Sequence, residues 1–140
     1  TYIKNVLANA KILAETLKNN GFKIYSGGTD THLMLVDLRP FNVKGNLAAE
    51  SLSRANITCN KNGIPFDSES PMITSGIRLG SQAATTRGFG LKEFQKVGEL
   101  ITKIIKGLSA DSNNNTNVEN EVRNEVIKLC SKFPIYKNLK

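Results

Sequence analysis

The order of hydrophobic patterns along the 140-residue chain is the feature that most limits how it can fold. Apolar residues at spacings of three and four predict four helices. These helices span residues 2–19, 46–55, 91–106 and 118–133. Short apolar runs predict strands at residues 22–26, 32–38, 57–59 and 76–80. Because strands and helices do not alternate regularly, the order does not fit a doubly wound sheet. We expect an α+β domain in which helices pack on a small mixed, mainly antiparallel sheet.

Glycine, proline and polar segments mark the expected boundaries of these elements. Gly21 is expected to end the first helix and Gly107 the third, since glycine is common just after a helix. Residues 107–117 are expected to form a polar linker before the last helix, which Pro134 ends. The short turn at residues 27–30 favours antiparallel pairing of the two strands that it joins. The first residue lies almost inside a helix, which is typical of a boundary cut from a longer chain.

The net charge of +7 and the pI near 9.5 leave a basic, nucleic-acid-binding module open as an alternative function. Against it, the basic residues are spread along the whole chain and do not form a cluster. Aromatic residues make up only 6% of the chain and there is no tryptophan, which disfavours a stacking platform for single strands. We expect most of this charge to lie on a solvated surface. A binding titration in salt separates the two functions, because nucleic-acid affinity falls steeply as salt rises.

The cysteines and the single histidine do not suggest a metal site. Cys59 and Cys130 are far apart in sequence, and neither has the spacing of metal ligands. Two reduced thiols are typical of a reducing compartment, so we expect a cytoplasmic protein. The sequence has no apolar run of the roughly 18 residues that a membrane span needs, so a membrane partner is not expected.

Arg78 is the residue most suited to binding a ligand. Side chains alternate along a strand, so Ile77 and Leu79 are expected to face the core and Arg78 the opposite side. A guanidinium can hold a carboxylate through two parallel hydrogen bonds. The alternative is a structural ion pair between Arg78 and Asp67 or Glu69, and the pattern alone leaves both possibilities open.

Other polar positions are ambiguous. Asn60 and Asn62 could hydrogen-bond the edge of a heterocycle or could form a tight turn. The Gly-Gly-Thr at residues 27–29 lacks the spacing and lysine of a phosphate-binding loop, which favours a turn. His32 has no serine or cysteine placed nearby by the sequence. No catalytic triad or carboxylate pair is evident.

Four segments resemble the serine hydroxymethyltransferase family. They are Gly-Gly-Thr-Asp-Thr-His and its following strand within residues 26–38, Asn-Lys-Asn-Gly-Ile-Pro-Phe-Asp at 60–67, Thr-Ser-Gly-Ile-Arg-Leu-Gly at 74–80, and Thr-Thr-Arg-Gly-Phe at 85–89. They come in the order and spacing of the family, and the resemblance runs from about residue 8 to 136. It covers the carboxy-terminal small domain of that family. Residues 1–140 are therefore expected to form that single domain, with residues 1–20 as the helix leading from a large domain.

This resemblance implies a transferase that depends on pyridoxal 5'-phosphate (PLP) and has the aspartate-aminotransferase type of fold. The family interconverts serine and tetrahydrofolate with glycine and methylenetetrahydrofolate. Arg78 matches the arginine that binds the α-carboxylate of the substrate, and Asn62 matches an asparagine that contacts the pterin ring of the folate. Ser70, Pro71 and Met72 match a loop of the folate site. Met72 stands where the family often has an aromatic residue.

The resemblance also implies that residues needed for catalysis lie elsewhere. The family's cofactor-binding lysine follows a run of threonines and a histidine in the large domain, and this sequence contains no such segment. We therefore expect no catalytic residue, bound cofactor or metal in the isolated chain, and no activity. The partners implied are the large domain, a second subunit, serine or glycine, and folate.

Overall fold

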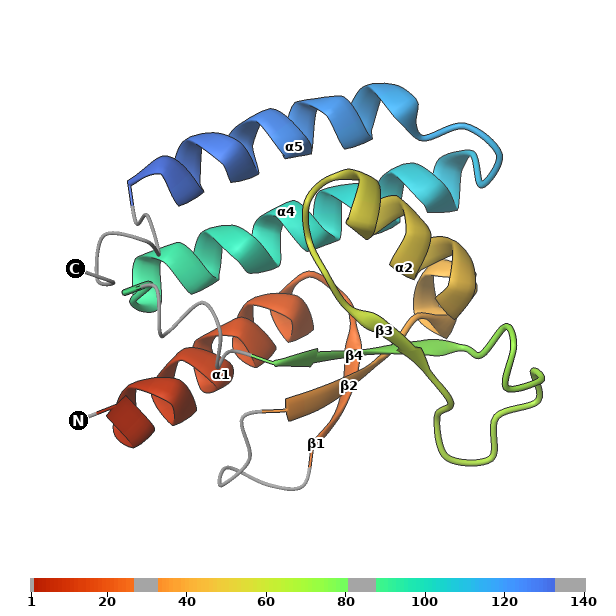
Figure 1. The fold of residues 1–140 in the computed structure, drawn as a ribbon. Helices are drawn as coiled ribbons and strands as arrows, with labels where there is room; N and C mark the ends of the chain where they lie inside the picture. The colour runs from red at the N-terminus through yellow and green to blue at the C-terminus, as the bar shows by residue number, and fades with distance from the viewer. Residues whose placement is uncertain (1, 27–32, 81–87, 133–140) are drawn as a thin grey trace.

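Helices cover one face of a four-stranded antiparallel sheet (Figure 1). A computed structural model describes residues 2–26, 33–80 and 88–132. The helices are α1 (Tyr2–Asn19), the short 3-10 helix η1 (Arg39–Phe41), α2 (Gly45–Arg54), α4 (Leu91–Ala110) and α5 (Thr116–Ser131). The strands are β1 (Lys23–Ser26), β2 (Leu33–Asp37), β3 (Asn60–Asn62) and β4 (Gly76–Gly80), in the spatial order β1-β2-β4-β3. The predicted α+β class with a mainly antiparallel sheet is confirmed.

Strand β4 lies inside the sheet and pairs on both sides. Leu35 of β2 and Asn60 of β3 lie opposite Arg78, and Val36 lies opposite Ile77. The side chains of Val36 and Ile77 are completely buried, as expected for residues that face the helices. The alternation therefore gives the sheet one apolar face and one face that carries Arg78.

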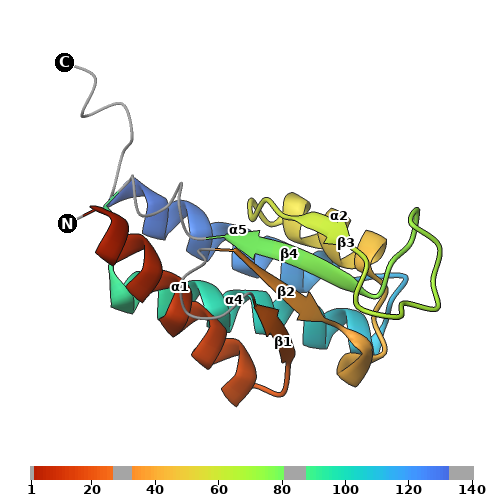
Figure 2. The ribbon, with the colours of Figure 1, turned by 90° about the horizontal axis from the view of Figure 1, so that it is seen from below.

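The apolar face packs on α1 and α2, and residues of α4 complete the same core. Seen from below in Figure 2, the sheet lies in front of α4 and α5, so its other face points away from the helix layer. Leu17 of α1 and Ile104 of α4 have no exposed surface. Full burial of such a side chain stabilises the fold by about 1.5–3 kcal/mol, so this layer fixes which face of the sheet is left open.

Two predicted boundaries are wrong, and a third lies two residues from its expected place. The run at 57–59 is not a strand; strand β3 begins directly after it, at Asn60, where pairing with β4 supplies the backbone hydrogen bonds. Helix α4 continues through Gly107 to Ala110. A Cβ at Gly107 would lie 2.1 Å from Oδ1 of Asn115, so this glycine allows close packing of the linker instead of ending the helix. Helix α5 starts at Thr116, which shortens the predicted linker.

The other boundaries agree with the sequence to within one or two residues. Gly21 follows α1 with a φ of +101°, and the amide of Phe22 donates to the carbonyl of Leu17, which closes the helix end. Strands β1 and β2 pair antiparallel as predicted. The turn at 27–30, His32 and most of the segment 85–89 lie outside the described residues.

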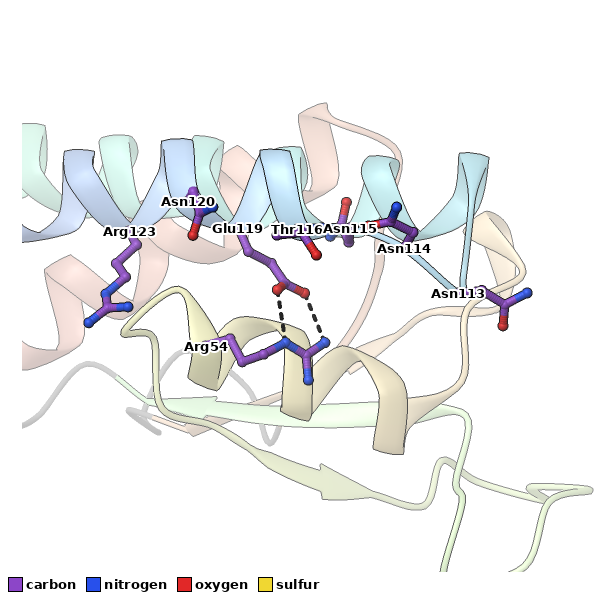
Figure 3. Close-up of a pocket in the computed structure, with 8 residues that line it drawn as sticks. All are labelled: Arg54, Asn113, Asn114, Asn115, Thr116, Glu119, Asn120 and Arg123. Carbon is purple, nitrogen blue, oxygen red and sulfur yellow. Dashed lines mark hydrogen bonds and ion pairs between the residues drawn. The ribbon is translucent and has the colours of Figure 1, made fainter.

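A polar network joins α2 to α5 (Figure 3). Arg54 of α2 donates from Nε and Nη2 to the two carboxylate oxygens of Glu119 on α5, each at 2.8 Å. Ser51 donates to the same carboxylate at 2.5 Å and accepts from Asn115 at 3.1 Å. Glu119 is only 5% exposed. The hydrogen bond from Arg54, opposed by burial and helped by Ser51, lowers the pKa of the Glu119 carboxyl.

Glu119→Gln is expected to destabilise the chain by about 1–3 kcal/mol at pH 7, because an amide places donors against the hydroxyl and guanidinium donors. A carboxyl whose pKa is lowered by folding stabilises the fold above its ordinary pKa of 4.5 and loses this contribution as the pH falls through its folded value. The difference in unfolding free energy between the original chain and the variant should therefore shrink below pH 4.5. Urea unfolding at several pH values measures it.

Glu121→Gln is the matched control on the same helix. Glu121 is 56% exposed and pairs with Lys103 at the surface, so its loss should change the stability by less than about 1 kcal/mol. A Glu119 effect that is equal to the control, or that does not vary with pH, would contradict the role given to this network.

Candidate functional site

The open face of the sheet carries a row of side chains that cross from strand to strand. Tyr25 lies opposite Leu35, Leu35 opposite Arg78, and Arg78 opposite Asn60. Residues directly opposite each other on paired strands point to the same face. Arg78 is exposed while its neighbours Ile77 and Leu79 are at most 5% exposed, which confirms the predicted orientation of the strand.

Arg78 does not form the structural ion pair that the sequence left open. Among the described residues, no hydrogen bond or ion pair engages its guanidinium. The Asp67 carboxylate accepts from backbone amides and Ser75, and Glu69 pairs with Lys44 at 2.6 Å. Both acidic candidates therefore have other partners, and neither pairs with the guanidinium.

The other charged groups on this face have partners. Asp37 is 1% exposed and accepts from the backbone amide and the guanidinium of Arg39. Burial acts to raise the pKa of Asp37, but the hydrogen bonds and charge of Arg39 lower it overall. Lys23 lies with its Nζ 5.2 Å from the centroid of the Tyr25 ring. Arg78 differs from these groups because none of the described residues pairs with its guanidinium.

The loop between β3 and β4 carries the remaining predicted site residues. Asn62, at the end of β3, is half-buried, and its Nδ2 donates to the carbonyl of Gly63 at 2.9 Å. This bond uses one of the two amide hydrogens of Asn62. Ser70 and Pro71 are exposed, and Met72 is 75% exposed. The structure thus places Asn62 on the strand beside Arg78, and the other three residues on a projecting loop.

Asp67 organises this loop. Burial acts to raise the pKa of its carboxyl, but hydrogen bonds from Glu69, Ser75 and Ile64 outweigh burial and lower the pKa to about 2. The carboxylate therefore stays charged at neutral pH. The loop also contains two non-glycine residues in the left-handed region, Phe66 at a φ of 56° and Thr74 at 61°. Such conformations persist only where surrounding contacts hold them.

Two cavities in the described part of the chain are lined by polar side chains. One, of about 480 Å³, lies between α2 and β3 and is lined in part by Asn46, Asn60, Lys61 and Pro71. The other, of about 580 Å³, lies beside the Arg54–Glu119 pair, and Figure 3 shows the residues that line it. The first cavity places Pro71 of the predicted folate loop close to the residue opposite Arg78.

The described residues contain no cluster of three or more histidine, cysteine, aspartate or glutamate side chains that could hold a metal ion. Within that part of the chain, no helix is long and apolar enough to cross a membrane. Burial raises the pKa of the Cys59 thiol to about 11, so this thiol stays protonated at neutral pH.

Comparison with known proteins gives a consistent family assignment. The family model described as serine hydroxymethyltransferase matches residues 1–101. The chain belongs to the serine hydroxymethyltransferase family. It is 85% identical over 139 residues to the serine hydroxymethyltransferase of Pelagibacter ubique, an alignment that covers 99% of this chain and 32% of that protein. It is 61% identical over 136 residues to the one from Marinomonas sp., with 97% and 32% covered. The chain thus spans about a third of the length of these relatives.

Sequence reasoning missed two features of the site in this chain. It did not single out Leu35 and Tyr25, which share the open face with Arg78; strand alternation could have found them once the pairing register was known. It weighed Asp67 only as a partner for Arg78. The signal for its real contacts is the sequence Asp-Ser-Glu followed by Thr-Ser-Gly, in which an acceptor lies near several turn amides.

Gly76→Ala is expected to destabilise the chain by about 1–3 kcal/mol, because the new Cβ has no room. It would lie 2.8 Å from the carbonyl oxygen of Val36 and 2.8 Å from Cγ2 of Ile64. The strand that carries Arg78 would have to shift away from β2. Urea unfolding of the purified chain measures the change.

Gly63→Ala is the matched control at the other end of the same loop. Its Cβ would meet only Oδ2 of Asp67, at an ordinary 3.8 Å. The stability of this variant should change by less than about 1 kcal/mol. Equal effects of the two substitutions would show that the close packing of Gly76 against β2 does not contribute to the stability of the sheet.

Proposed function

We propose that this chain supplies the substrate-carboxylate site and part of the folate site of a PLP-dependent serine hydroxymethyltransferase. The reaction is the interconversion of L-serine and tetrahydrofolate with glycine and 5,10-methylenetetrahydrofolate. The observation that carries the proposal is Arg78: in a chain of this family, its guanidinium is exposed on the open face of the sheet, and no partner for it is found among the described residues. The chain then corresponds to the carboxy-terminal small domain, with residues 1–20 leading from a large domain.

Arg78 binds the α-carboxylate of serine or glycine in this proposal. Its planar fork allows two parallel charge-assisted hydrogen bonds, which fix both the position and the orientation of the carboxylate. A fixed carboxylate limits rotation of the α-carbon, so the bond to be broken can be aligned with the cofactor. The pairing of β4 with both neighbours supports this role, because it holds the backbone of Arg78 from two sides.

Asn62 and residues 70–72 form part of the folate site in this proposal. The Asn62 amide keeps its oxygen and one N–H for a ligand, which suits the mixed donors and acceptors on the edge of a pterin ring. Met72 adds an apolar side chain that is largely exposed.

The described residues do not fit a PLP site by themselves. Lys23 lies over the Tyr25 ring, and Lys61 lies opposite Ile77, on the strand register that faces away from Arg78. PLP, when bound, supplies the electron sink for breaking a bond at the α-carbon. The groups that hold it belong, in this proposal, to the remaining two thirds of the protein, to a second subunit, or to both. A cytoplasmic location stays a prediction from the sequence.

The isolated 140-residue chain is expected to form no covalent bond to PLP at a defined lysine and to leave serine unconverted. Absorbance spectra after mixing with PLP, followed by peptide mapping, test the first expectation. A glycine assay with serine and tetrahydrofolate tests the second. A single modified lysine together with turnover would contradict the proposal that the groups that hold PLP lie outside this chain.

Arg78→Ala is best tested in a hybrid enzyme, defined as the Pelagibacter ubique relative with its matching 139-residue segment replaced by this chain. The kcat/KM for serine is expected to fall at least about 30-fold, the equivalent of ~2 kcal/mol, because a charge-assisted pair with the carboxylate is lost. Steady-state kinetics at saturating tetrahydrofolate measure this value.

Arg123→Ala is the matched control, because it removes an exposed arginine from α5, a helix that does not belong to the sheet. Its kinetics should equal those of the unmodified hybrid. Unchanged serine kinetics in Arg78→Ala would refute the proposed role of that residue.

A further inference from the structure

One carboxylate joins the two ends and the middle of the β3–β4 loop. Oδ2 of Asp67 accepts from the amide of Ile64 at 3.2 Å and from the amide of Ser75 at 2.8 Å. Oδ1 accepts from the amide of Glu69 at 2.9 Å and from the hydroxyl of Ser75 at 2.8 Å. Ile64 follows β3 and Ser75 precedes β4, so these four bonds close the whole loop on a single side chain.

The two halves of the loop have different supports. The amides of Gly45 and Asn46, at the start of α2, donate to the carbonyls of Thr74 and Ile73, which ties the second half to that helix. The turn at residues 70–74 closes on the carbonyl of Ser70. The first half has the exposed Lys44–Glu69 pair as a link to the rest of the protein. The hydrogen bonds of Asp67 join the first half to the second.

Arg78 has supports that do not involve Asp67. Its backbone lies in β4 between β2 and β3, and the paired residues Leu35 and Asn60 fix its register. Loss of the Asp67 contacts would therefore release the first half of the loop while leaving the strand pairs in place. The loop and the carboxylate site can be disturbed separately.

We propose that Asp67 is a positioning residue for folate, because its carboxylate fixes the segment 64–69, which joins Asn62 to residues 70–72. This inference rests on the proposed function. In it Asp67 does not touch the folate; it acts by holding the loop that does. The left-handed conformations of Phe66 and Thr74 agree with this role, since they need outside contacts to persist.

The test is a comparison of Michaelis constants in the hybrid enzyme. Asp67→Asn keeps the size of the side chain but replaces one acceptor oxygen with a donor NH2, which cannot accept the bonds that this oxygen receives. The KM for tetrahydrofolate is expected to rise at least tenfold, while the KM for serine changes less than threefold. A role limited to overall stability would not separate the two substrates.

Glu69→Gln is the matched control. It removes a carboxylate from the same loop whose partner is the exposed Lys44, and both Michaelis constants should stay within twofold of the original values. Ser75→Ala is a milder second variant, which removes one of the four hydrogen bonds. It should raise the KM for tetrahydrofolate severalfold, and it decides the question alone if Asp67→Asn does not fold.

The outcomes separate this proposal from the proposed function. A selective rise in the folate constant supports the positioning role. No rise, or an equal rise for both substrates, overturns it, even when Arg78→Ala impairs serine use as expected. If Arg78→Ala leaves serine kinetics unchanged while Asp67→Asn acts selectively on folate, the carboxylate assignment fails and the positioning role of Asp67 stands.

Discussion

The pairing of β4 with strands on both sides is the constraint on which the rest of this structure depends. It buries Ile77 and Leu79 against the helix layer and, by the strict alternation of a strand, turns Arg78 to the open face. Gly76 permits the close approach of β2 and of Ile64 at the start of this strand. The same short segment thus connects the hydrophobic core to the candidate binding face, so packing changes in the core would also move the guanidinium.

Much of this arrangement could be predicted from the sequence, because local patterns and tertiary structure agree. The helix at residues 2–19, the paired strands that follow, and the outward orientation of Arg78 all come from apolar spacing and alternation. Strand β3 could not be predicted, since Asn-Lys-Asn has little intrinsic preference for a strand and extends only because β4 lies beside it. The end of α4 was mispredicted for a similar reason. The role of Gly107 is set by its contact with Asn115, in the segment between α4 and α5, and not by the local sequence.

Some residues of the candidate site could be identified from the sequence, and others could not. Arg78 could be chosen from the sequence, but its alternative partners, Asp67 and Glu69, could be dismissed only once their hydrogen bonds were known. The roles of Asn62, Ser70, Pro71 and Met72 come from the family resemblance and remain predictions. The organising role of Asp67 depends on four bonds from three separate residues, and the local sequence signals the nearby turn amides but not the bonds to Ser75 across the loop.

The central claim is that Arg78 binds the substrate carboxylate, and a crystal structure of the hybrid enzyme with PLP and glycine tests it most directly. The account predicts two parallel N–H···O contacts of about 2.7–2.9 Å between the Arg78 guanidinium and the glycine carboxylate. A glycine carboxylate bound by a different side chain, with Arg78 pointing away from it, would contradict the account.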